Sequence, residues 1–163
     1  MLRGMLRPGM RAYLIPFTAG LALAASVFLP WVIIGDIPLI GFPDMAALWI
    51  LGLGALASTL SVLSLITRRN SRHPLLLIGL VSLGITFLSW RLMPRSVADR
   101  AQTRSQALAI VEDVQAQKAP SSLPGPGIYL GLTASVVLVT FGLTIVVRRA
   151  TTTYEVVDPD DDA

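Results

Sequence analysis

The stretch FLPWVIIGDIPLIGFPD, residues 28–44, decides the fold, because it divides a long apolar run into two candidate membrane spans. It is apolar enough for a membrane, yet it contains three prolines, two glycines and two aspartates. One helix through this stretch would hold Pro30, Pro38 and Pro43 in its interior, and each interior proline costs roughly 3 kcal/mol. The chain is therefore expected to leave the membrane near Pro30 and to return near Asp44.

Two short runs within this stretch predict a hairpin of extended strands. The runs WVII and IPLI flank Gly35 and Asp36 and are rich in β-branched residues, which favour strands. The order Gly-Asp is less favourable for a two-residue turn than Asp-Gly, and Pro38 is tolerated only in an edge strand. Asp44 is expected at the N-cap of the next helix, where a carboxylate accepts a backbone N–H.

The composition around this stretch is that of a membrane protein. Of the 163 residues, 53% are hydrophobic and 14% are charged, whereas roughly a quarter of the residues of a soluble domain are charged. Apolar runs of about 18 or more residues are typical of membrane helices. One membrane domain, residues 12–149, is expected between a basic N-terminal segment, residues 1–11, and an acidic tail, residues 150–163. Its four expected spans are residues 12–30, 45–66, 74–90 and 127–147.

The positions of Lys and Arg predict that both termini lie in the cytoplasm. The N-terminal segment, the loop at 67–73 and the pair Arg148 and Arg149 after the last span together hold eight of these residues, and the longer loop at 91–126 holds five. Because Lys and Arg accumulate on the cytoplasmic side, the loops at 31–44 and 91–126 are expected outside. The predicted location is the cytoplasmic (inner) membrane.

Residues 94–118 predict an amphipathic helix in the second outer loop. They contain no glycine, and Val97, Leu108 and Val111 fall on one weakly apolar stripe. Three interpretations stay open: a surface helix on the spans or on the membrane interface, a docking surface for a partner, and a disordered loop. The segment APSSLPGPG, residues 119–127, is expected to break this helix before the last span.

The sequence indicates no catalytic site. It has no cysteine, and the inner thirds of the expected spans hold no ionisable residue, which disfavours ion or proton transport. The single histidine, His73, is a weak candidate for binding a haem or pigment, and a solvated position beside Pro74 is the competing interpretation. The arginines lie at span ends, so nucleic acid is not an expected partner. We expect no enzyme activity, no metal site and no cofactor.

Small and hydroxylated residues predict how the spans pack. Hydroxyls in membrane helices bond to their own helix or to a neighbour, and small residues four apart let helix backbones approach closely. This packing could join helices of one chain or of two subunits. The small pairs are Gly20 and Ala24, Gly54 and Ser58, and Gly131 and Ser135.

The first loop carries a resemblance to other proteins. A span ending in LPW (residues 29–31), a short extended excursion, a glycine and an acidic residue opening the next span resemble a broad group of small bacterial four-span membrane proteins. The likeness covers roughly residues 20–66, and a weaker likeness is found in GPGIYLGL, residues 125–132. The layout is also similar to that of claudin-like proteins, although their cysteine pair and second loop tryptophan are missing here. The resemblance implies an architecture and no activity.

These observations predict an all-α membrane protein: a four-helix transmembrane bundle with a small outer hairpin and an outer amphipathic helix. The expected function is a non-catalytic accessory or assembly subunit of a larger bacterial membrane complex, such as a respiratory or photosynthetic one. The alternatives are a lipid-, quinone- or pigment-binding carrier and a homo-oligomeric cell-envelope scaffold. Membrane lipids and other membrane subunits are the expected partners. Trp31, Trp49 and Trp90 are expected in an interfacial aromatic belt. The candidate partner contacts are Trp31, Ile33, Ile40, Phe42, Leu108 and Val111.

Overall fold

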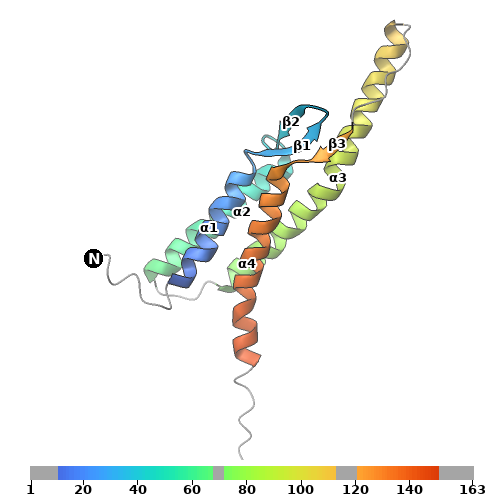
Figure 1. Ribbon diagram of the computed structural model, residues 1–163. Helices are drawn as coiled ribbons and strands as arrows, with labels where there is room; N and C mark the ends of the chain where they lie inside the picture. The colour runs from blue at the N-terminus through green and yellow to red at the C-terminus, as the bar shows by residue number, and fades with distance from the viewer. Residues whose placement is uncertain (1–10, 68–71, 113–120, 151–163) are drawn as a thin grey trace, which may run out of the picture.

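The computed structural model describes residues 11–67, 72–112 and 121–150, and it shows a helical protein with one small sheet (Figure 1). A short 3₁₀ turn, η2, precedes the first helix. The basic residues 1–10, the tail beyond residue 150 and residues 113–118 of the expected amphipathic helix lie outside the described residues. The helices are η2 (Arg11–Tyr13), α1 (Leu14–Ser26), α2 (Met45–Thr67), α3 (Arg72–Glu112) and α4 (Pro126–Ala150).

Three helices of the described part, α2, α3 and α4, are long and apolar enough to cross a membrane. This agrees with the prediction of a membrane protein. Helix α1 is apolar but has only 13 residues, fewer than the span expected at residues 12–30. It is short because the chain tightens into turns, in which the Phe28 N–H donates to the Ala25 carbonyl at 3.1 Å, and then enters a strand at Pro30.

The four helices pack as two pairs, α1 with α2 and α3 with α4, and the pairs meet chiefly through α1 and α4. The predicted small residues lie at these contacts. A Cβ added at Gly20 would lie 2.6 Å from Ser58 Oγ, and one at Gly54 would lie 2.7 Å from the Ala24 nitrogen. Gly131 on α4 faces α1 and α3 in the same way. The small-residue stripes therefore join helices within this chain.

The hydroxyls of the helices donate to carbonyls of their own helix, as the sequence predicts. Ser58 Oγ bonds to the Gly54 carbonyl at 2.9 Å, and Ser135 Oγ bonds to the Gly131 carbonyl at 2.8 Å. Ser64 is an exception, because its buried hydroxyl has no hydrogen-bond partner among the described residues. The same i−3 or i−4 pattern is made by Thr18, Ser26, Thr59, Ser61, Ser82, Thr86, Thr133 and Thr140.

The sheet contains the predicted hairpin and one strand that was not predicted. Strands β1 (Pro30–Ile34), β2 (Ile37–Ile40) and β3 (Ser122–Pro124) are antiparallel and lie in the order β2-β1-β3. The hairpin turns at Gly35, whose φ of 57° suits glycine. Pro38 lies in the edge strand β2, where its missing N–H is tolerated. Strand β3 falls in the segment expected only to break a helix.

Helix α3 differs from the prediction. The expected third span, residues 74–90, and the helix expected from Pro94 onward form one continuous helix with Pro94 inside it. Proline has no backbone N–H, so the Trp90 carbonyl one turn earlier loses its helical donor. The Pro94 carbonyl itself accepts a tertiary hydrogen bond from Ser122 Oγ at 2.7 Å. Figure 1 shows the later part of α3 projecting beyond the sheet, so the interpretation as a helix lying on the spans is wrong.

Candidate partner-binding surface

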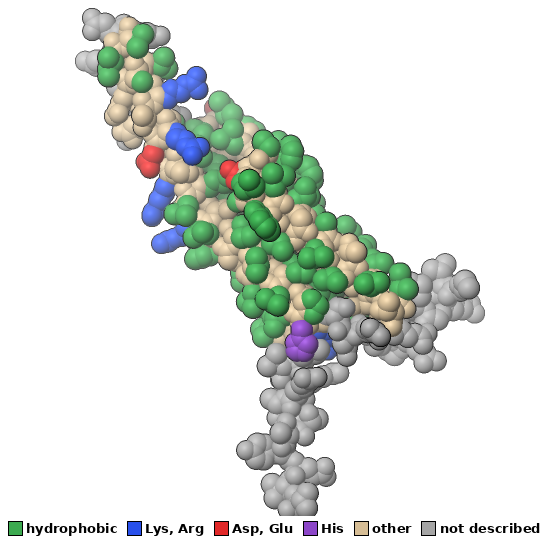
Figure 2. Space-filling model, turned by 180° about the vertical axis from the view of Figure 1, so that it is seen from behind, with side chains coloured by type: hydrophobic (Ala, Val, Ile, Leu, Met, Phe, Trp, Pro, Cys, Tyr) green, Lys and Arg blue, Asp and Glu red, His purple; other side chains and the backbone are tan. Residues whose placement is uncertain are grey.

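The described charged residues lie toward the two ends of the molecule, and hydrophobic side chains cover the body between them (Figure 2). His73, the sequence candidate for a cofactor ligand, is exposed in the first turn of α3 at the end opposite the sheet. Among the described residues, no group of three His, Cys, Asp or Glu could hold a metal ion.

Trp31 organises the sheet end of the molecule from the inside. Its side chain is fully buried, and its indole N–H donates to the Ser26 carbonyl at 2.9 Å. That carbonyl belongs to the last turn of α1, where carbonyls have no backbone N–H from a following helical turn to accept. Glycines make room for the ring: a Cβ at Gly41 would lie 2.8 Å from it, and one at Gly127 would lie 2.7 Å from it. Trp31 thus closes the end of α1 and supports the sheet above it.

The burial of Trp31 corrects two predictions, because a fully buried ring can neither sit in an interfacial belt nor contact a partner. The other two tryptophans have more exposed surface. Trp49 is 63% exposed on α2. Trp90 on α3 is half-buried, and its ring centroid lies 5.7 Å from that of Phe87.

Strand β2 turns apolar side chains outward. All four of its residues are exposed, among them Ile37 at 66% and Ile40 at 54%. Phe42, which follows the strand, is 41% exposed and stacks on Phe28 with ring centroids 6.4 Å apart. Ile33 on the central strand is half-buried. Of the contacts predicted in this loop, Ile40 and Phe42 are therefore on the surface and Ile33 is partly available.

The second exposed feature is the part of α3 beyond Pro94, residues 95–112, which we call the α3 extension. Near its tip, Leu108 is 49% exposed and Val111 is 81% exposed, so both predicted contacts are on the surface. Ile110 is 83% exposed and was missed, because it lies beside the stripe that the helical period indicates. Blue Lys and Arg side chains are spread along this part of the molecule in Figure 2. The exposed arginines of this region, from just before the extension to its middle, are Arg91, Arg95, Arg100 and Arg104.

Asp44 lies between two hollows at the sheet end. Its Oδ1 accepts the Ala46 N–H at 2.9 Å, which confirms the predicted N-cap of α2. One hollow, of about 240 Å³, separates the start of α2 from α3 and includes Leu92 and Ser96 in its lining. The other, of about 350 Å³, runs beneath the sheet and includes Ile40 and Val97. Both hollows are lined mainly by apolar side chains.

Comparisons with protein-family models, with curated proteins and with solved structures find no match for this chain. The described residues offer apolar surface on β2 and at the tip of the α3 extension, with arginines between them.

Proposed function

We propose that this chain is a non-catalytic accessory or assembly subunit that binds another membrane protein through its sheet end. The observation that carries the proposal is the α3 extension, which holds Ile110 and Val111 more than 80% exposed (83% and 81%) and away from the other helices. Covering apolar surface gains about 25 cal/mol per Å². Exposed apolar patches of this kind mark sites of protein contact.

The topology that we propose has four spans, with α1 as the first. Helix α1 is apolar and packs against both α2 and α4, as a spanning helix of the same bundle would. Four spans put the basic N-terminal segment and the loop at 67–73 on the cytoplasmic side, and the sheet end on the other. The α3 extension then reaches the outer side of the membrane.

The partner that we propose is a subunit of a larger complex in a bacterial cytoplasmic membrane, with respiratory and photosynthetic complexes as the candidate classes. The bacterial membrane follows from the resemblance of residues 20–66 to small bacterial four-span proteins. A homo-oligomeric scaffold would use the same surface, and self-association would distinguish it from a foreign partner.

Purification from the native membrane in mild detergent tests the proposal. The wild-type chain should co-purify with a partner, and the double variant Ile110→Ser, Val111→Ser should lose on the order of tenfold in recovered partner, equivalent to about 1.4 kcal/mol. The matched control is Gln106→Ser, Ala107→Ser, because these residues are also exposed on the extension. Copurified chains would be identified by mass spectrometry. A monodisperse wild-type monomer without other chains would refute the proposal.

A further inference from the structure

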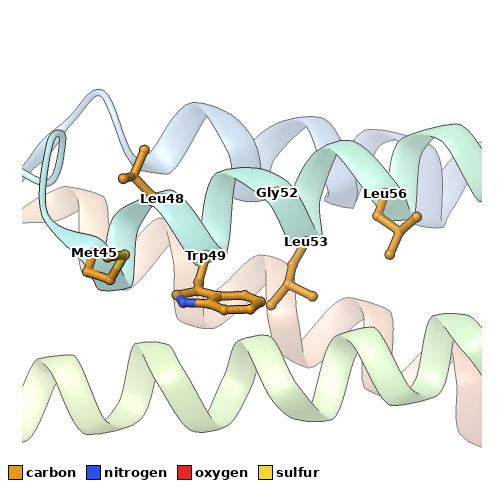
Figure 3. A pocket seen from close by; sticks show the side chains of 6 residues that line it. All are labelled: Met45, Leu48, Trp49, Gly52, Leu53 and Leu56. Atoms are coloured by element: carbon orange, nitrogen blue, oxygen red, sulfur yellow. The ribbon is translucent and has the colours of Figure 1, made fainter.

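A groove runs along α2 on the side that faces α3. Figure 3 shows Trp49 and Leu53 pointing from α2 toward α3. Helix α2 packs mainly on α1 and α3 mainly on α4, so α2 and α3 are less closely joined beside this groove. The groove has a volume of about 350 Å³, and all of its lining residues are on α2: Met45, Leu48, Trp49, Gly52, Leu53 and Leu56.

The groove is apolar along α2 and polar near the start of that helix. The adjoining hollow between α2 and α3 is lined by Ile85, Leu88 and Leu92 together with the polar Asp44, Ser89 and Ser96. The two hollows together are called the α2–α3 groove below. The indole N–H of Trp49 makes no hydrogen bond within the described part of the chain, and Figure 3 shows its nitrogen turned toward Met45, next to Asp44.

We infer that the α2–α3 groove holds one membrane phospholipid whose headgroup carries an amine. Helices α2 and α3 are apolar enough to cross the membrane, so the groove between them is open to lipid. An apolar channel with a polar end matches an acyl chain joined to a headgroup. The acyl chain lies along Trp49 and Leu56, and the Trp49 N–H is a donor for an ester oxygen.

The charges at the polar end select the headgroup. Asp44 is exposed and lines the groove, so its carboxylate attracts an ammonium group. Arg95 is exposed on α3 next to the lining residue Ser96, although it does not itself line the groove. In this proposal its long side chain reaches the lipid phosphate. One negative and one positive side chain complement the zwitterion phosphatidylethanolamine. Phosphatidylglycerol has a phosphate but no cation, so Asp44 disfavours it.

Gly52 allows the groove to be filled without disturbing the fold. A Cβ added at Gly52 meets no atom within 4 Å, and Gly52 lines the groove, so Gly52→Leu places a side chain in the lipid site. Gly84 on α3 is the matched control, because a Cβ there also meets nothing within 4 Å and Gly84 is not a lining residue. Both changes replace a helical glycine with leucine and raise helix propensity equally.

Asp44→Asn tests the headgroup charge separately. Asparagine caps helices about as well as aspartate, so α2 keeps its N-cap while the carboxylate charge is removed. Asp36→Asn is its control, because Asp36 is also exposed and lies in the hairpin turn, and it lines neither hollow of the groove.

The measurement is native mass spectrometry of the purified chain in detergent micelles that contain phosphatidylethanolamine and phosphatidylglycerol in equal amounts. Wild type should retain one phosphatidylethanolamine, and Gly52→Leu should lower that occupancy by about fivefold while Gly84→Leu preserves it. Asp44→Asn should lower the ratio of phosphatidylethanolamine to phosphatidylglycerol by about threefold, and Asp36→Asn should leave the ratio unchanged. Equal retention of the two lipids by wild type would overturn the inference, and so would unchanged occupancy in Gly52→Leu.

Discussion

Trp31 and Asp44 each satisfy the backbone at the end of a helix with a side chain. The Asp44 carboxylate accepts an N–H at the start of α2, and the Trp31 indole donates to a carbonyl at the end of α1. The first role is predictable, because an aspartate immediately before an apolar helix is a local signal. The second is not, because a tryptophan at the end of a span has the same sequence signature whether it faces the interface or lies beneath a sheet.

Trp31→Phe should lower the free energy of unfolding by about 1–3 kcal/mol, because it removes a buried hydrogen bond and part of a packed ring. The comparison variant is Trp49→Phe, the same exchange at a position that is 63% exposed, for which a change within about 0.5 kcal/mol is expected. Unfolding would be followed by circular dichroism in mixed micelles of increasing SDS content. Equal losses in the two variants would show that Trp31 does not organise the sheet end.

The secondary-structure elements differ in how far the sequence alone predicts them. The β1–β2 hairpin could be predicted because its strands, turn glycine and flanking prolines all lie within residues 28–44. Strand β3 could not, because SLP is too short for an alternating pattern and pairs with a strand far away in the chain. The length of α3 was missed for another reason: a proline predicts a helix boundary, and the contact of Ser122 with Pro94 that accompanies the exception is tertiary.

The continuity of α3 through Pro94 predicts a distance. The chain has no native cysteine, so spin labels can be attached to Gly84→Cys and Thr103→Cys alone, both at exposed positions of α3. A helix rises about 1.5 Å per residue, so double electron–electron resonance should give one narrow distribution near 28 Å. A broad distribution, or one centred well below this distance, would mean that the extension folds back over the spans.

The molecule as a whole is two helix pairs that pack on each other through α1 and α4 and are also linked by the sheet at one end. Strand β1 follows α1, and its neighbour β3 leads into α4, so the sheet connects the first helix pair to the second. The apolar body and its small-residue contacts could be predicted from composition and spacing. The exposed groove between α2 and α3 could not, because it arises from which helices pair, and apolar spans of similar composition give no signal for that choice.

Four spans predict which positions share a side of the membrane. In intact cells, a membrane-impermeant maleimide should label Asp36→Cys and Thr103→Cys, at the hairpin turn and on the α3 extension. It should label His73→Cys and a cysteine at Leu2 only after the membrane is opened. These two positions are two spans apart, and an odd number of spans separates each of them from the hairpin turn and from the α3 extension. Each variant has a single thiol, since the native chain has none. Labelling at Leu2 from outside, with His73→Cys still protected, would show that α1 does not cross.

Strands β2 and β3, which pair with the two edges of β1, are synthesised at different times. Strand β2 follows β1 directly, whereas β3 begins at Ser122, long after β1 ends at Ile34. A ribosome adds about 5–20 residues per second, so one edge of β1 waits roughly 4–18 s for its second neighbour during synthesis. An unpaired edge can join a strand of another chain. The sheet is therefore completed only after α3 has been made, and the pace of translation sets the shortest time for which that edge stays open.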